Sequence, residues 1–166
     1  MPTSDPLQIL LSHDQWATRQ ILQACQELSE EQFHQKFEMG LGSLHDTLTH
    51  IVGAMRGWGD MLAEREQRER LELNDTIRTP DELIRLVDEA SLDLVETQQG
   101  KGVDEWVSGQ RGGRTFRFLR GSVLTHVTTH GMHHRAQCLN MLRHLGVDPL
   151  PPSSVLEWML MDDLNE

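Results

Sequence analysis

Apolar side chains recur with helical spacing in four long stretches of the chain, separated by segments rich in polar and turn-forming residues. The stretches run from about Pro6 to Leu28, from Ser43 to about Arg68, from Thr79 to a connector that begins at Gly100, and from Leu119 to Leu145. Four amphipathic helices of this length predict an all-α protein folded as a four-helix bundle. Because the connectors are long, the pattern leaves the order of the helices around the bundle open.

Residues at the ends of these stretches support the boundaries. Ser43 can accept a hydrogen bond from the free amides of the second helix. Thr79, Pro80 and Glu82 form a capping box with proline at the first helical position of the third helix. Gly146 follows the fourth stretch, where a glycine commonly ends a helix. These signals predict three well-defined helix ends.

Two shorter elements complete the predicted architecture. The connector from Gly100 to Phe118 contains two short extended segments around Gly112 and Gly113, a pattern that favours a short β-hairpin before the last long helix. Ser154 and Glu157 have the spacing of a capping box and predict a short C-terminal helix. At 166 residues the chain fits a single domain over residues 1–166.

Charge and composition narrow the classes of partner. The chain has 26 acidic and 15 basic residues, a net charge of −11, which opposes binding to nucleic acid. Cys25 and Cys138 form no CxxC pair and favour a reducing compartment. The N-terminus lacks the features of a signal peptide, and no stretch reaches the roughly 18 apolar residues of a membrane span. We therefore expect a cytoplasmic protein that does not interact with membranes.

The strongest chemical signal is a pair of histidines in the last long helix. His130 and His134 are four residues apart on a face that also carries aliphatic residues, so both imidazoles can reach one cation. His50, at the edge of the apolar face of the second helix, is the best candidate for a third ligand. Buried imidazoles need a hydrogen-bond partner, a charge or a metal ion. The pattern favours a metal site formed by His50, His130 and His134, and hydrogen-bonded core histidines are the alternative.

Other polar residues have weaker patterns. His126 falls on the histidine face and could be a fourth ligand, a hydrogen-bond donor to a ligand or a substrate contact, whereas His133 falls on its outer edge and suits solvent or an interface. His13 could line one end of a cavity or pack half-exposed. Gln137 could orient a ligand or substrate, and Arg135 could pair with a carboxylate across the bundle or at a dimer contact. Three further histidines have positions typical of surface residues: His34, His45 and His144.

Two segments, SLHDTLTHI at 43–51 and HVTTHGMHHRAQ at 126–137, resemble the DinB-like family, with weaker similarity at 11–17 and 142–146. The resemblance extends through nearly the whole chain and implies a four-helix bundle, often a homodimer. It implies that His50, His130 and His134 bind a divalent metal, usually zinc or nickel. The chain departs from the family at Ala136, where glycine is common, and at His133, where an aromatic or apolar residue is frequent.

Three histidine ligands leave an open coordination position, which is typical of a catalytic metal site. Relatives in the family include thiol-dependent transferases, in which the metal would hold the sulfur as a thiolate. We therefore expect a divalent-metal-dependent enzyme with a small-molecule substrate and a low-molecular-weight thiol as cosubstrate, catalysing S-transfer. A metal-assisted hydrolase that uses metal-bound water and a non-catalytic metal-binding bundle are the alternatives. The sequence assigns no catalytic residue.

Overall fold

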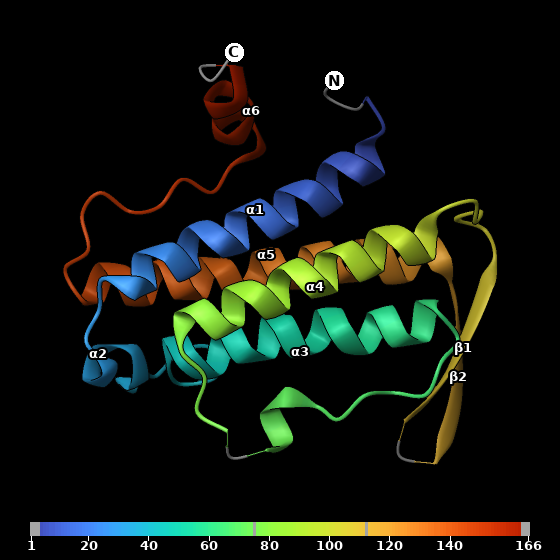
Figure 1. Ribbon diagram of the computed structural model, residues 1–166, viewed down its shortest axis with the longest axis horizontal. Helices are drawn as coiled ribbons and strands as arrows, with labels where there is room; N and C mark the ends of the chain where they lie inside the picture. Colours follow the sequence, from blue (N-terminus) through green and yellow to red (C-terminus); the bar gives the residue numbers. More distant parts are fainter. Residues whose placement is uncertain (1–3, 75, 112, 164–166) are drawn as a thin grey trace.

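Four long helices pack into a bundle in the structure, a computed structural model that describes residues 4–74, 76–111 and 113–163 (Figure 1). The four helices are α1 (Pro6–Gln26), α3 (Leu44–Leu62), α4 (Pro80–Gln98) and α5 (Arg120–His144). Shorter elements lie in the connections and at the C-terminal end: α2 (Glu30–His34), a 3₁₀ turn η1 (Leu71–Leu73), β1 (Trp106–Arg111), β2 (Arg114–Leu119) and α6 (Val155–Asp163). The predicted four-helix bundle is confirmed.

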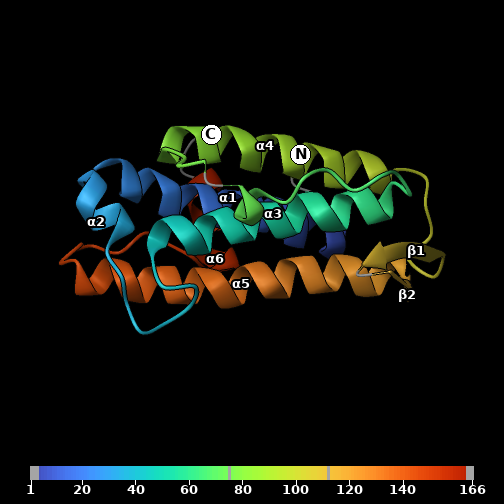
Figure 2. The ribbon, with the colours of Figure 1, turned by 90° about the horizontal axis from the view of Figure 1, so that it is seen from below.

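The helices do not follow one another around the bundle in chain order. Both α1 and α3 pack against α4 and against α5, so α1 and α3 lie diagonally opposite each other (Figures 1 and 2). The segment of residues 27–43, which contains α2, makes this diagonal crossing possible. The arrangement places α3 directly beside α5, and these are the two helices that carry the candidate metal ligands.

The helix ends agree with the capping signals. The Ser43 hydroxyl accepts a hydrogen bond from the Asp46 amide at 3.1 Å. Thr79 and Glu82 form a reciprocal capping box at the start of α4. Gly146 follows α5 with a φ of 83°, in the left-handed region that favours glycine.

The apolar faces of the helices meet in one continuous core, to which the two cysteines contribute. The largest fully buried side chains come from all four long helices: Ile21, Leu22, Leu44, Leu48, Ile51, Val52, Leu62, Leu83, Leu94, Leu124, Met141 and Leu142. Burying this apolar surface is the main favourable contribution to folding. Among the helices described, none is both long and apolar enough to cross a lipid bilayer.

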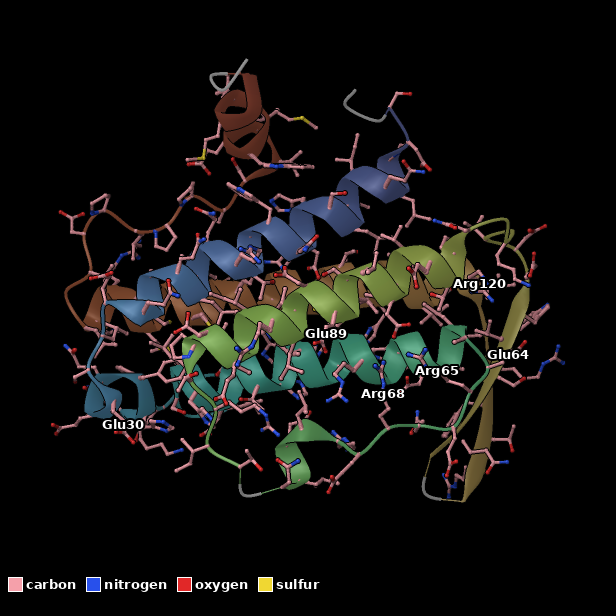
Figure 3. All side chains as sticks on the ribbon, viewed as in Figure 1. Glu30, Glu64, Arg65, Arg68, Glu89 and Arg120 are labelled. Carbon is pink, nitrogen blue, oxygen red and sulfur yellow. The ribbon has the colours of Figure 1, made fainter. Side chains whose placement is uncertain are left out.

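The second long helix is shorter than its pattern predicts, and the expected extension to Arg68 is wrong. Helix α3 ends at Leu62, and Glu64 adopts a φ of 51° that turns the chain away. The fully buried carboxylate of Asp60 then accepts hydrogen bonds from Arg65 Nε at 2.7 Å and from the Arg68 backbone amide at 2.9 Å. Figure 3 shows these two arginines over the C-terminal half of α3. These polar contacts therefore hold the segment after α3 in a non-helical conformation, although its sequence pattern predicts that the helix continues.

The predicted hairpin and terminal helix are also present. Strands β1 and β2 pair antiparallel, with Val107 opposite Phe118 and Gly109 opposite Phe116. Gly113 adopts a φ of 74° in the turn, while Gly112, which the sequence also predicts in the turn, lies outside the described residues. Helix α6 packs against α1. The hairpin lies at one end of the bundle, where β1 contacts α3 and β2 contacts α5.

Candidate metal centre

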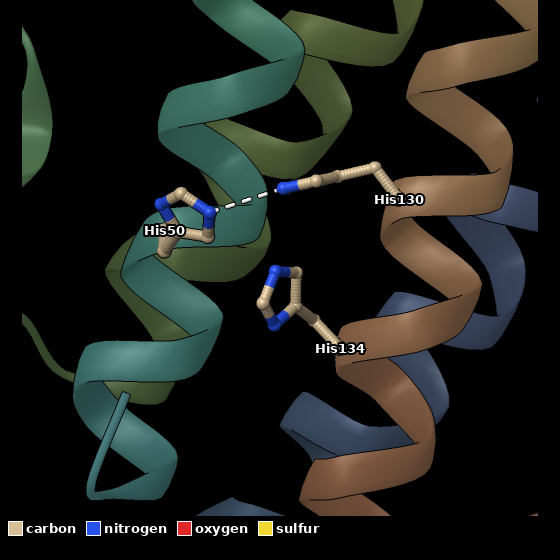
Figure 4. A group of neighbouring side chains, drawn as sticks. All are labelled: His50, His130 and His134. Atoms are coloured by element: carbon tan, nitrogen blue, oxygen red, sulfur yellow. Dashed lines mark hydrogen bonds between the residues drawn. The ribbon is translucent and has the colours of Figure 1, made fainter. Parts of the chain in front are cut away.

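Helices α3 and α5 bring His50, His130 and His134 together (Figure 4). One ring nitrogen of each lies within 4.8 Å of the others, and Nε2 of His50 is 3.1 Å from Nε2 of His130. Two nitrogens bound to one tetrahedral zinc ion at about 2.0–2.1 Å would be about 3.3 Å apart. The three imidazoles therefore have a spacing that suits one divalent cation, in the ligand set that the sequence indicates.

Two neighbouring side chains orient the rings. Nδ1 of His50 lies 2.9 Å from a carboxylate oxygen of Glu72, and Nδ1 of His134 lies 2.8 Å from the amide oxygen of Gln137. Both partners are acceptors, so each Nδ1 carries the proton and each Nε2 keeps its lone pair for a cation. Such contacts fix the tautomer and raise the basicity of a ligating histidine. The structure thus gives Gln137 the ligand-orienting role considered from the sequence.

Glu72 is the residue that sequence reasoning missed. It lies in η1, 22 residues after His50 and outside the predicted helix faces and motifs. Gly53, one turn after His50 on α3, leaves room for it, because a Cβ atom there would lie only 2.7 Å from Oε2 of Glu72. Gly53 and Glu72 therefore fit together in the fold. Neither residue alone indicates this contact, because glycines in helices and carboxylates in connecting segments are common in sequences.

The local electrostatics keep two of the three candidate ligands, His130 and His134, neutral. Burial, together with repulsion from the other histidines, lowers the pKa of His130 to about 4. Burial also lowers the pKa of His134, although its hydrogen bond to Gln137 acts in the opposite direction. Burial raises the pKa of Glu72, but hydrogen bonds from its own backbone and from His50, with the charge of Arg70, hold it below its usual value. At neutral pH the site therefore presents the uncharged imidazoles of His130 and His134 and an ionised Glu72 carboxylate, which suits a cation.

The site opens on one side into a cavity of about 540 Å³. His50 and His130 line this cavity with residues of α3, of the segment that contains η1, and of the hairpin. Two of the three candidate ligands, His50 and His130, therefore face the cavity. A molecule in the cavity would lie directly beside the position that the three nitrogens surround.

His126 is not buried, although it falls on the same face of the helix as His130 and His134 in the sequence pattern. It is exposed and lines the cavity, with its ring centroid 5.4 Å from that of His130 and 5.0 Å from that of Trp58. It does not belong to the group of converging ligand atoms. The expectation that His126 shares the face of the partly buried ligands is therefore wrong, because the cavity and not packed core lies beside α5 at this position. The position of His126 fits a substrate contact.

The remaining histidines do not join the site. His13 is buried at 9% exposure and its Nε2 lies 3.0 Å from the Ser153 carbonyl oxygen, so it anchors the segment before α6. His45 is also buried, so its predicted surface position is wrong. Its Nε2 accepts a hydrogen bond from the Arg78 backbone amide, which holds the ring inside the protein. His133 is exposed on α5, and its Nε2 lies 3.1 Å from Nε2 of Gln137, the side chain that orients His134.

Arg135, directly after the ligand His134, forms a buried ion pair with Asp14 of α1. Its guanidinium also donates to Thr18 at 3.2 Å. Gly131 permits this packing, because a Cβ atom there would lie 2.4 Å from the Asp14 carboxylate. The pairing across the bundle considered for Arg135 is therefore present, and it fixes the turn of α5 that carries His130 and His134.

Fold and site together define a four-helix-bundle protein with a candidate three-histidine metal centre. A sequence profile of the DinB family matches residues 1–158. Protein DinB of Bacillus subtilis (strain 168) is 27% identical over 152 residues, which are 86% of this chain and 87% of that protein. The crystal structure of a DinB-like protein from Bacillus cereus ATCC 10987, 18% identical, has the same fold, with a TM-score of 0.67 over 86% of this chain and 92% of that one. The chain belongs to the DinB family.

Proposed function

We propose that this protein is a divalent-metal-dependent enzyme that acts on a small molecule by thiol-dependent S-transfer. The observation that carries the proposal is the convergence of three imidazole nitrogens within 4.8 Å beside a cavity of about 540 Å³. A cavity of this size suits a small molecule. The net charge of −11 favours such a substrate over a nucleic acid.

The side chains around the site prepare it for this chemistry. A divalent cation held by the three histidines, zinc or nickel in this proposal, would lower the pKa of a thiol or water that binds beside it. Glu72 and Gln137 hold two of the imidazoles in the required tautomer. The cavity admits a thiol and a second reactant to the open side of the cluster, where His126 and Trp58 also line the wall.

The same open side supports hydrolysis as a second candidate, since water could occupy the position proposed for the thiol. A purely structural ion predicts instead a closed shell of protein ligands. Within the part of the chain that the structure describes, the converging ligand atoms come from three histidines. This set supports an open site.

The experiment compares activities of zinc-loaded and nickel-loaded protein. Low-molecular-weight thiols are assayed with electrophiles such as 1-chloro-2,4-dinitrobenzene, and aryl esters and amides serve as hydrolysis substrates. Turnover that His50→Ala abolishes and that the control His144→Ala, at an exposed histidine near the end of α5, retains would support the proposal. Turnover of esters alone would favour hydrolysis, and no turnover above His50→Ala with either set would contradict an enzymatic role.

We further propose that the protein works in the cytoplasm as a homodimer, as the family resemblance implies. Light scattering of the purified, metal-loaded protein tests the oligomeric state. A mass of twice 19.0 kDa supports the dimer, and a mass of 19.0 kDa contradicts it.

A further inference from the structure

An unbroken series of ring contacts leads from the hairpin to the histidine cluster. Phe116 and Phe118 of β2 stack with centroids 6.3 Å apart and an interplanar angle of 3°. Phe118 meets Trp58 of α3 edge-on at 6.3 Å, and Trp58 meets His126 at 5.0 Å. His126 in turn lies 5.4 Å from the ligand His130. All five rings line the same cavity.

The inner face of the hairpin explains why the two phenylalanines lie over this cavity. Val107, Gly109, Phe116 and Phe118 are cross-strand partners and therefore share one face. Val107 is buried, and a Cβ atom on Gly109 would lie 3.1 Å from Met61 of α3. The β1 half of the face thus packs closely on the bundle. The two rings of the β2 half extend past this contact over the cavity.

Both phenylalanine rings remain exposed in spite of this position. Phe116 and Phe118 are each 39% exposed. Anchoring of the hairpin does not need their full apolar surface, because Val107 and the close approach of Gly109 already supply that contact. A planar apolar group in the cavity would cover this surface and find stacking and edge-on partners among the surrounding rings.

We propose that the hairpin side of the cavity binds an aryl group of the substrate, held by Phe116, Phe118 and Trp58. This inference rests on the proposed function, since it names the substrate class of the same cavity. The aryl group would be joined by a short linker to the atom that reacts beside His50 and His130. Phe118 is a specificity-determining residue in this arrangement, and it touches the substrate away from the reacting atom.

The test compares two alcohols of similar size, phenylmethanol and cyclohexylmethanol, binding to the zinc-loaded protein. Binding is followed by the NMR shift of the Trp58 indole N–H, which is assigned by its loss in Trp58→Phe. Aromatic contacts contribute beyond the area they bury, so we expect phenylmethanol to bind about fivefold more tightly. Phe118→Leu keeps an apolar side chain at an exposed position and should bring the ratio of dissociation constants close to one.

Trp106→Leu is the matched control, because Trp106 belongs to the same hairpin, is 57% exposed and does not line the cavity. It should leave the preference for phenylmethanol unchanged. Equal affinities of the two alcohols for the wild type, no saturable binding of phenylmethanol, or a preference that survives in the Phe116→Leu/Phe118→Leu double variant would each overturn the proposal.

The alcohol measurement is separate from the test of the proposed function. Neither probe carries a thiol or an electrophilic centre, so binding is measured whether or not the protein turns over a substrate. Aryl preference without S-transfer or hydrolysis would leave the aryl subsite in place and contradict the enzymatic proposal. Turnover without aryl preference would support the enzymatic proposal and contradict the aryl subsite.

Discussion

A carboxylate oxygen of Glu72 lies 2.9 Å from Nδ1 of His50, although the two residues belong to different elements. The contact ties η1 to α3 and directs the other ring nitrogen of His50 towards His130. The Glu72 side chain is 20% exposed, and its negative charge is partly balanced by Arg70 at 3.4 Å. Glu72 therefore supports the candidate metal centre without belonging to its ligand set.

Replacing Glu72 should weaken metal binding. Glu72→Gln removes the negative charge that strengthens the hydrogen bond from His50, and we expect the zinc affinity to fall by about 10-fold to 100-fold. Competition with a chromogenic chelator measures this change. Glu69→Gln makes the same charge change at another residue lining the cavity and should have little effect. Equal losses in the two variants would mean that overall charge, and not the contact with His50, controls affinity.

Gly53→Ala should reproduce part of this loss through sterics alone. The new Cβ atom would lie 2.7 Å from the Glu72 carboxylate, so that side chain must move away from His50. The ideal control is Gly57→Ala, one turn later on α3, where an added Cβ meets nothing within 4 Å. Both substitutions favour helix by about 0.5–1 kcal/mol. We expect only Gly53→Ala to weaken zinc binding in the chelator assay, and unchanged affinity would show that Glu72 is not held by this packing.

The buried ion pair between Arg135 and Asp14 should matter for stability. Arg135→Met leaves the Asp14 carboxylate buried without its charge partner, which costs about 3–5 kcal/mol of unfolding free energy. Urea denaturation of the metal-free protein measures the loss. Arg143→Met changes an exposed arginine near the end of the same helix and should shift the unfolding free energy by less than about 0.5 kcal/mol. A similar small shift for Arg135→Met would contradict the structural role of the pair.

His13 should make stability depend on pH. Burial and the nearby charge of Arg135 lower its pKa below 6.5, against the hydrogen bond with Ser153. The unfolded chain therefore takes up a proton at His13 at a higher pH than the folded chain does. The stabilisation is present above about pH 6.5, the unfolded-state value, and is lost as the pH falls through the folded-state pKa.

Urea denaturation of wild type and His13→Gln between pH 7.5 and 5 checks this expectation. The variant removes the titrating group but keeps a polar side chain near the Ser153 carbonyl. The unfolding free energy of the wild type should fall more steeply on acidification than that of His13→Gln. Parallel curves would contradict a lowered pKa at His13.

Local signals in the sequence predicted much of the fold. Ser43, Thr79 and Gly146 mark helix ends because each satisfies or terminates backbone hydrogen bonding through its own side chain or conformation. The spacing of His130 and His134 indicates one face of a helix for the same local reason. These features depend on neighbours within one or two helical turns, so the amino-acid sequence alone predicts them.

Tertiary contacts account for what the sequence did not predict. Helix α3 ends at Leu62 because the Asp60 carboxylate accepts hydrogen bonds from Arg65 and Arg68. The sequence does not predict this end, since the charged segment after Leu62 contains no helix-breaking residue. The contact of Glu72 with His50 depends on where η1 folds back against α3. Such long-range pairings leave no periodic pattern, so burial and partners at these positions follow only from the fold.

X-ray absorption at the zinc edge of the metal-loaded protein measures which atoms surround the ion. We expect one zinc per chain with three imidazole nitrogens at about 2.0–2.1 Å and an additional non-protein ligand. Loss of one imidazole from the spectrum of His134→Ala would assign that residue. Zinc that fails to bind at one ion per chain, or that binds with fewer than three imidazoles in the wild type, would contradict a metal centre built from His50, His130 and His134.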